Sequence, residues 1–176
     1  MKPTNSLFII RPFSLADAPL LYAAVRETCD ELCRWMTWCR PDYSPADSHS
    51  FILRSAQDWQ HDLAYFFAAV DQRDGTLLGS VGISQINRRH QLANLGYWVR
   101  SSSTRQGVAT QATHLAAHFA LQKLGLNRIE ILVPADNLPS QRVAQKTGAE
   151  FEGVLRKRLI LQQGQADALL YSIVRK

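Results

Sequence analysis

The stretch from Leu92 to Lys123 constrains the fold more than any other part of the sequence. Residues 92–99 are typical of a strand, a polar loop follows over 100–106, and a long helix begins at Gly107. One face of this helix is apolar, at Val108, Ala112, Leu115, Ala116 and Phe119. A further strand is predicted over 128–133. A strand, a helix and a strand in this order predict a parallel crossover, with the helix packed on the sheet.

The strands before this unit are arranged differently. Residues 65–70 and 77–84 are predicted strands, and the segment 71–76 between them contains an Asp-Gly pair, which is a hairpin signal. A second turn at 88–91 leads into the strand at 92–99, so three consecutive antiparallel strands are predicted. This context does not fit the Rossmann fingerprint, whose glycine turn follows the first strand of a parallel unit. The absence of a Gly-Lys-Ser/Thr ending excludes a Walker-type loop.

The N-terminal part of the chain is predicted to be mostly helical. An edge strand at Leu7–Phe13 is followed by a capping box, Ser14 with Asp17, that opens a first helix. A second helical region is expected from Cys29 to about Cys39. A third helix is opened by Ser44, Pro45 and Asp47.

Together with a helix after Asn137 and two final strands, these elements predict an α/β (α+β) fold. We expect a mixed, mostly antiparallel sheet of about six or seven strands flanked by about four or five helices. The chain has 176 residues, of which 46% are hydrophobic, with no repeat or linker-like stretch, so one domain is expected over 1–176. The sequence lacks an apolar run of about 18 residues and a recognisable signal peptide, so we expect a cytoplasmic protein without membrane association.

The formal charge of +5 is compatible with a polyanionic cofactor, an acidic partner or nucleic acid. Basic residues occur in short groups, at 88–90 and 156–158, without a long run that interleaves aromatic residues. Direct nucleic-acid recognition is therefore the weaker interpretation.

The sequence does not predict a metal site. Cys29, Cys33 and Cys39 have spacings that do not match a zinc pair, and reduced thiols in a helical segment are the expected state. His114 and His118 fall away from the apolar stripe of their helix and have no identifiable third ligand. A solvated helix face is the expected environment of both histidines.

The loop Arg105–Thr110 carries the clearest chemical signal. A helix N-terminus has backbone N–H groups without partners and a partial positive charge, so it suits a phosphate or pyrophosphate. Gly107 lets an anion approach the backbone closely, and Arg105 can add a charge-assisted contact. By itself, such a turn is equally consistent with an ordinary helix start.

The sequence around this loop resembles the GNAT superfamily of N-acetyltransferases, and more closely its branch of ribosomal-protein N-terminal (Rim-type) acetyltransferases. Residues 94–99 resemble the strand before the family's cofactor loop, and 105–110 resemble the loop itself. The family's Asn-x-x-Ser-x-Arg-Val-x-x-Lys-x-Gly run is matched by Asn137, Ser140, Arg142, Val143, Lys146 and Gly148. The match continues with Glu152, Gly153, Leu155, Arg156, Asp167 and Tyr171. The resemblance covers nearly the whole chain.

This resemblance implies acetyl-CoA as co-substrate and no metal. In the family, two parallel strands splay apart around the cofactor, so Val99 would offer backbone groups to the acetyl and pantetheine portion. The pyrophosphate would lie beside Arg105 on the amides of Gln106, Gly107, Val108, Ala109 and Thr110. Asn137 and Ser140 would lie near the pantetheine arm and the sulfur, with Ser140 as a candidate general acid. From the residues alone, Asn137 followed by a proline is at least as consistent with an ordinary helix cap.

The general base is not identified by the sequence. Many relatives carry a carboxylate where this chain has Asn94, and another near the position of Leu159. The alternatives are an ordered water with backbone carbonyls, or another residue such as Asp30, Glu31 or Tyr97. An amine that arrives neutral needs less assistance, which favours an α-amino group with a pKa of about 8 over a lysine near 10.4.

The acceptor side of the cleft is expected at Trp35, Trp38 and Tyr97, with Met36 and Tyr43 nearby. Trp35 and Trp38 lie at helical spacing, so a place in the core is the alternative for both.

These observations predict an acetyl-CoA-dependent N-acetyltransferase that acts on a primary amine by direct transfer in a ternary complex. The acceptor is expected to be the N-terminal amine of a ribosomal or other protein, or a small molecule. The alternative is an acetyl-CoA-binding sensor or partner module without catalysis. The resemblance is compatible with a homodimer, although the sequence carries no interface signature. It leaves contact with nucleic acid open only through association with the ribosome.

Overall fold

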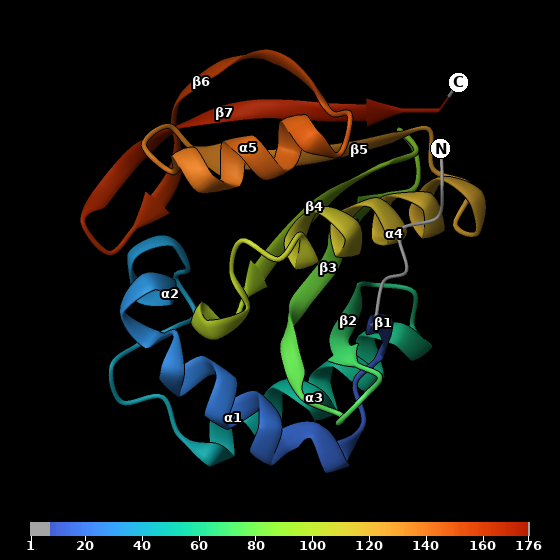
Figure 1. Ribbon diagram of the computed structural model, residues 1–176. Helices are drawn as coiled ribbons and strands as arrows, with labels where there is room; N and C mark the ends of the chain where they lie inside the picture. Colours follow the sequence, from blue (N-terminus) through green and yellow to red (C-terminus); the bar gives the residue numbers. More distant parts are fainter. Residues whose placement is uncertain (1–7, 176) are drawn as a thin grey trace.

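The computed structural model describes residues 8–175, and within them one seven-stranded sheet carries all the strands (Figure 1). The strands are β1 (Phe8–Pro12), β2 (Tyr65–Asp71), β3 (Leu77–Asn87), β4 (Leu92–Val99), β5 (Arg128–Pro134), β6 (Glu150–Leu161) and β7 (Gly164–Val174). The α-helices are α1 (Ala18–Glu27), α2 (Cys29–Trp35), α3 (Pro45–Gln60), α4 (Val108–Gln122) and α5 (Leu138–Lys146). Two short 3₁₀ turns, at Leu15–Asp17 and Ser101–Ser103, complete the regular structure of this part of the chain.

The sheet has the order β1-β2-β3-β4-β5-β7-β6, and only the β4–β5 pair is parallel. That pair is short, because its register runs only from Leu92 opposite Arg128 to Asn94 opposite Glu130. Beyond Asn94 the two strands separate. The mixed, mostly antiparallel sheet with a splayed parallel pair is therefore confirmed.

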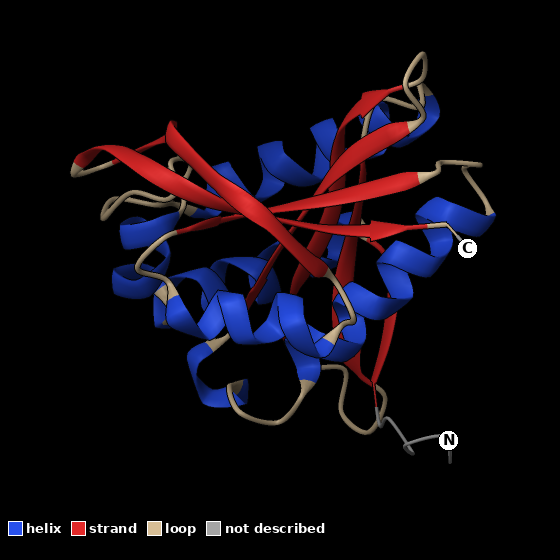
Figure 2. Ribbon diagram, turned by 90° about the horizontal axis from the view of Figure 1, so that it is seen from above, coloured by secondary structure: helices blue, strands red, loops and turns tan. Residues whose placement is uncertain are grey.

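Helices cover both faces of the sheet, as the view from above shows (Figure 2). Helices α4 and α5 belong to one core, and helices α1, α2 and α3 contribute to the other. Strand β2 shows how one strand serves both, since Phe67 and Ala69 lie in the first core and Ala68 and Val70 in the second. The small side chains on the inner face of α4, such as Ala112 and Ala116, are completely or almost completely buried against the sheet.

Three predicted boundaries in the N-terminal part need correction. The first strand ends at Pro12, one residue early, and Leu7 lies outside the described residues. The capping box of Ser14 and Asp17 is present, but it opens a 3₁₀ turn, and the α-helix begins only at Ala18. The carboxylate of Asp17 is shared with Arg11, with Nη1–Oδ2 at 2.6 Å, so this box also joins the helix to β1.

The second helical region ends at Trp35 rather than near Cys39. Met36 takes an extended backbone conformation, with φ of −118° and ψ of 118°, and the chain turns back there. Beyond this point, Trp38 packs against Tyr43 and Trp98, with ring centroids 6.0 and 6.4 Å apart. This tertiary packing overrides the helical pattern.

The other elements agree with the sequence-based expectations. The third helix begins at Pro45 behind a complete capping box of Ser44 and Asp47, and β4 has the predicted bounds. Gly107 is the N-cap of α4, and Asn137 is the N-cap of α5. Within residues 8–175, no helix combines the length and the apolar character needed to cross a bilayer.

A cluster of charged side chains joins β5, β7 and β6, the last three strands in the sheet order. Arg128 on β5 binds Glu130 on its own strand, with Nε–Oε1 at 2.8 Å, and makes a two-pronged contact with Glu152 on β6. The hydroxyl of Ser172 on β7 also donates to Glu152, at 2.6 Å. Glu130 is thus part of a strand-surface ion pair, as its spacing from Arg128 indicates. The hydrogen bonds from Arg128 and Ser172 lower the pKa of Glu152 from 4.5 to about 2.

We predict that Glu152→Gln reduces the acid sensitivity of the folded chain. Because the pKa of Glu152 is lower in the folded state, its contribution to stability is complete above about pH 4.5 and is lost as the pH falls toward 2. Urea unfolding at pH 7 and pH 3 should show a larger loss of unfolding free energy for the wild type than for Glu152→Gln. Glu150→Gln, on the same strand but outside the cluster, serves as the control and should behave like the wild type. Equal acid sensitivity of wild type and Glu152→Gln would contradict the prediction.

Candidate acyl-transfer site

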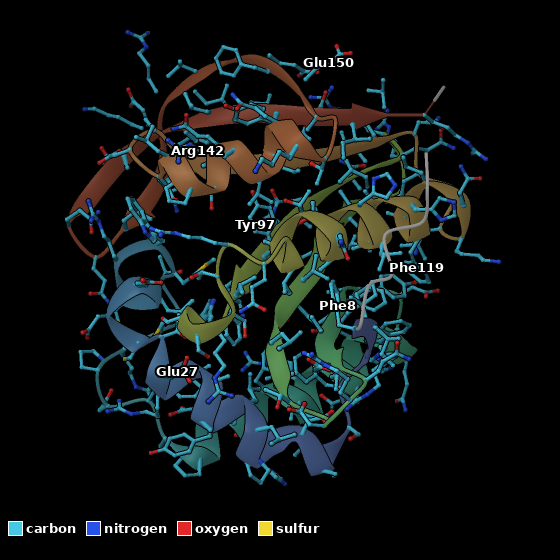
Figure 3. The ribbon with its side chains drawn as sticks, in the orientation of Figure 1. Phe8, Glu27, Tyr97, Phe119, Arg142 and Glu150 are labelled. Atoms are coloured by element: carbon cyan, nitrogen blue, oxygen red, sulfur yellow. The ribbon has the colours of Figure 1, made fainter. Side chains whose placement is uncertain are left out.

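The separation of β4 and β5 creates a gap with unpaired backbone groups. Strand β4 continues to pair with β3 as far as Val99, but its other edge has no partner on β5 beyond Asn94. A side chain bridges the gap: the hydroxyl of Tyr97, labelled in Figure 3, donates to the backbone carbonyl of Ser140 on α5, at 2.7 Å. This bond joins the free part of β4 to the helix on the opposite side of the gap.

The loop Arg105–Thr110 follows β4 and leads into α4, and its backbone conformation is unusual. Arg105 and Gly107 both lie in the left-handed region, with φ of 62° and 79°. Within the described residues, the N–H groups from Arg105 to Thr110 donate no intramolecular hydrogen bond. Alternating left-handed residues and a helix N-terminus together direct such groups toward one point, as in known phosphate sites.

The segment that leads from β4 into this loop is held by the end of α1. The carboxylate of Glu27 contacts Arg100 and accepts from the N–H of Ser102 at 2.8 Å, and Thr28 Oγ1 accepts from the N–H of Ser101 at 3.1 Å. Burial opposes ionisation of Glu27, but the hydrogen bonds from Ser102 and Arg100 outweigh it and lower its pKa. The loop is therefore fixed in place by a helix from the other face of the sheet.

The N-terminus of α5 lies across the gap from β4. Asn137 is buried, and its Oδ1 accepts from the N–H of Ser140 at 3.2 Å, so the capping role of this side chain is present in the structure. Ser140 is half-buried and lies at the point where Tyr97 crosses the gap. The cap thereby fixes the backbone that carries the Ser140 hydroxyl.

A cavity of ≈ 420 Å³ lies between the sheet, including β4, and helix α3. Its aromatic lining consists of Trp38, Tyr43, Phe51, Phe66, Tyr97 and Trp98. The charged side chains in the lining are Arg40, Asp47, Arg54 and Asp58, which gives two positive and two negative groups. The cavity is therefore mainly apolar, with balanced charges at its wall.

Among the predicted acceptor residues, the structure brings Trp38 and Tyr97 into this cavity, together with Met36 and Tyr43. Trp35 is not part of the lining. It ends α2, and the guanidinium carbon of Arg34 lies 4.5 Å from the centre of its ring. The extended conformation of Met36 explains why two tryptophans at helical spacing point to different surroundings.

Sequence reasoning missed the charged wall of the cavity. Asp47, Phe51, Arg54 and Asp58 lie along one stripe of α3, at intervals of three and four residues. Residues three and four positions apart share one side of a helix, so this spacing in the sequence is the signal that could have indicated the stripe. Asp47 is ionised, because hydrogen bonds from Ser44 and the ion pair with Arg40 lower its pKa.

The structure also places the residues considered for proton transfer. Asn94 lines the cavity at the last position where β4 pairs with β5, and its side-chain oxygen is buried without a hydrogen-bond donor in the described part of the chain. Asp30 and Glu31 are exposed on α2 and outside the lining, and Leu159 lies on β6 opposite Ala166. Burial raises the pKa of the Tyr97 phenol, which keeps its proton at neutral pH.

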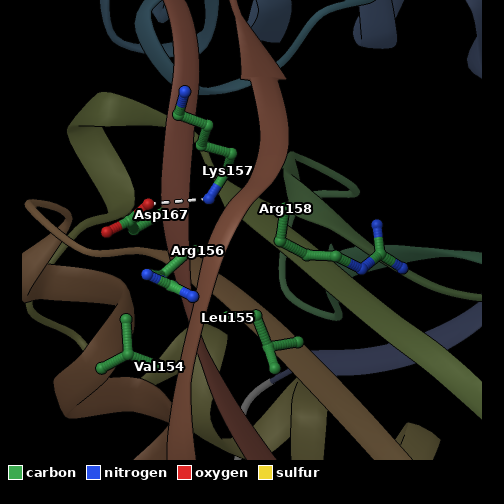
Figure 4. A pocket seen from close by; sticks show the side chains of 6 residues that line it. All are labelled: Val154, Leu155, Arg156, Lys157, Arg158 and Asp167. Carbon is green, nitrogen blue, oxygen red and sulfur yellow. Dashed lines mark hydrogen bonds between the residues drawn. The ribbon is translucent and has the colours of Figure 1, made fainter.

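Two other features noted in the sequence lie outside this region. His114 and His118 are exposed on α4. The basic residues Arg156, Lys157 and Arg158 line a shallow hollow on β6, where Lys157 has a φ of 51° and its backbone N–H donates to Asp167 at 2.7 Å (Figure 4). This hollow shares no lining residue with the cavity beside α3.

Comparison with known proteins agrees with this geometry. Residues 8–150 match the family described as "Acetyltransferase (GNAT) domain". The chain is 30% identical to "Probable N-acetyltransferase YjcK" of Bacillus subtilis (strain 168) over 152 residues, which are 85% of this chain and 84% of the relative. It is 25% identical to the ribosomal-protein-serine acetyltransferase of Escherichia coli (strain K12) over 146 residues, or 80% and 82% of the two chains.

A solved structure shares both the fold and part of the sequence. The microcin C7 self-immunity acetyltransferase MccE, in complex with acetyl-CoA and AMP, superimposes with a TM-score of 0.88 at 26% identity, covering 97% of this chain and 94% of that one. The sequence match over most of the chain, the splayed strands and the amide-lined loop lead to one conclusion. This chain belongs to the GNAT acetyltransferase family.

Proposed function

We propose that this chain transfers the acetyl group of acetyl-CoA to the α-amino group of a protein or peptide, by direct transfer in a ternary complex. The observation that carries the proposal is the set of free backbone N–H groups at Arg105–Thr110, where the splayed strand meets α4. The family match supports acetyl transfer, and MccE was solved with acetyl-CoA bound.

The residues present fit this donor. Six consecutive backbone positions with free N–H groups can hold a pyrophosphate, and Arg105 adds a positive charge beside them. The unpaired edge of β4 near Val99 can hydrogen-bond the amide groups of the pantetheine arm. Bound acetyl-CoA would supply an activated thioester. Positioning of the reactants and proton transfer would be carried out by residues of the chain.

We assign Ser140 as the group that donates a proton to the departing thiolate, with Asn137 as a positioning residue. The cap bond from Ser140 N–H to Asn137 fixes the first turn of α5, and the Tyr97 bond fixes the same turn relative to β4. Both contacts restrict where the Ser140 hydroxyl can lie, which lowers the entropic cost of proton transfer.

The charges of the cavity favour an amine that arrives without excess positive charge. Two carboxylates are offset by two guanidinium groups in the lining, so a polycation gains no net attraction. Asn94 stands where a carboxylate base would be expected, and amide side chains do not remove protons. At pH 7.5 roughly a quarter of an α-amine with pKa about 8 is already neutral, against about 0.1% of a lysine side chain.

Similarity to the ribosomal-protein-serine acetyltransferase supports a protein N-terminus as acceptor. The first side chain of a peptide can pack against the aromatic residues of the lining. Backbone groups and serine hydroxyls of the lining can form hydrogen bonds with the peptide. A small-molecule amine is the alternative acceptor. A sensor that binds acetyl-CoA without turnover is the alternative function, favoured by the missing carboxylate at Asn94.

We predict that the chain binds acetyl-CoA and releases free thiol in the presence of peptides with a free N-terminus. Turnover should be measured with matched peptides that carry a free or a blocked N-terminus, with and without a lysine, and with a panel of small amines. Release that depends on the free N-terminus supports the proposal. Binding without turnover on any acceptor indicates the sensor, and turnover on small amines alone indicates the other acceptor class.

We predict that Gly107→Ala raises the Kd for acetyl-CoA about tenfold, equivalent to about 1.4 kcal/mol. A methyl group at this left-handed position strains the loop and crowds the approaching phosphate, although its nearest protein atom, Gln111 Nε2, is 4.0 Å away. Gly75→Ala is a matched control, because Gly75 has a φ of 76° in an open turn far along the chain from the loop. Each substitution should cost about 1 kcal/mol of stability.

Calorimetric titration of both variants with acetyl-CoA separates strain from binding. The control should lose stability but keep the wild-type Kd. An unchanged Kd for a folded Gly107→Ala variant would argue against this loop as the pyrophosphate site.

A further inference from the structure

The three cysteines, which the sequence separates by three and five residues, meet in one buried cluster. Cys29 and Cys33 lie one turn apart on α2, and Cys39 returns to them after the chain turns at Met36. Their Sγ atoms are 3.7 Å (29–33), 4.0 Å (29–39) and 3.3 Å (33–39) apart. All three are free thiols and at most 9% exposed.

These distances are close to those between three thiolates that bind a single metal ion, although the Cys33–Cys39 pair is shorter. With metal–sulfur bonds of about 2.3 Å in tetrahedral geometry, neighbouring sulfurs are about 3.8 Å apart. A disulfide needs only two sulfurs and would leave the third without a role. We propose that Cys29, Cys33 and Cys39 form a three-thiolate site for a thiophilic d¹⁰ metal ion, Zn(II) or Cu(I).

The surroundings supply the other requirements of such a site. The guanidinium of Arg26 lies 3.9 Å from Cys29 Sγ and can offset the negative charge of three thiolates. The carbonyl oxygen of Arg40 lies 3.5 Å from the same sulfur, close enough to direct a fourth ligand or a water.

The site would brace one wall of the cavity beside α3. The segment from Met36 to Tyr43 contains Cys39 and contributes four residues to the cavity lining. A metal bound to Cys39 and to both helical cysteines would tie this segment to α2. Gln162 on the β6–β7 turn also holds it, through a bond of 3.1 Å from Nε2 to the Cys39 carbonyl. Metal binding itself does not depend on the proposed function. An effect of the bound metal on the KM for the acceptor, through the wall of the cavity, does rest on it.

The first experiment is a titration of the full, reduced chain without acetyl-CoA under anaerobic conditions, using Co(II) as a spectroscopic substitute for Zn(II). One equivalent should give thiolate-to-cobalt charge-transfer bands and tetrahedral d–d bands, and Zn(II) should displace the cobalt. A second titration with Cu(I), in competition with a chromophoric chelator, distinguishes the two ions. In parallel, one equivalent of the tighter ion should slow thiol alkylation at all three cysteines at least tenfold.

Substitutions then test the ligand set. Cys29→Ser, Cys33→Ser and Cys39→Ser should each weaken metal binding at least tenfold, whereas His118→Ala, at an exposed histidine, should leave it unchanged. Because a buried serine can impair folding, alkylation protection in the wild type provides a measurement that needs no variant.

Three outcomes would overturn the site. One is a reduced chain that shows no thiolate–metal bands and no protection with either ion. Another is binding that survives the cysteine substitutions but is lost in His118→Ala. The third is formation of a Cys33–Cys39 disulfide by a chain that binds neither ion when reduced, which would identify a redox pair instead.

Discussion

The short pairing between β4 and β5 is the constraint on which the rest of the site depends. After Asn94 and Glu130 the strands separate, so the edge of β4 keeps free backbone groups inside a folded domain, where such groups are normally paired. The crossover helix α4 follows the loop after β4, and within the described residues its first N–H groups donate no intramolecular hydrogen bond. A continuous ladder between β4 and β5 would leave no space for a donor between them.

The gap is kept open by contacts from both faces of the sheet. Tyr97 fixes its width by bonding to the backbone of α5, and Glu27, at the end of α1, holds the segment that leads from β4 into the amide-lined loop. Each contact joins residues far apart in the sequence, so the site is assembled only when both helical layers are packed. In the cavity lining, α3 supplies Phe51, two carboxylates and one guanidinium, Arg40 supplies the second guanidinium, and Asn94 contributes an amide. This combination suits an amine that is already neutral.

Much of the fold follows from local signals. The bounds of β4, the capping box of α3 and the glycine that starts α4 were predicted, because each depends on a short pattern of turn, cap or apolar residues. The end of α2 and the start of α1 were not, since they depend on partners distant in the chain. Trp38 leaves the helical path to pack on Trp98, and Asp17 is shared with Arg11. The spacing of the charged residues on α3 can be seen in the sequence, but only the structure shows that these residues line the cavity.

The sequence by itself determined the order of the elements, the parallel crossover, the glycine turn that starts α4 and the resemblance to the family, because each follows from periodicity, glycine placement or ordered motifs. Only the tertiary structure decided where the strands part and which tryptophan faces the cavity. It also decided that the three cysteines lie within 4.0 Å of one another. Such features depend on contacts between segments whose separation along the chain no local pattern encodes.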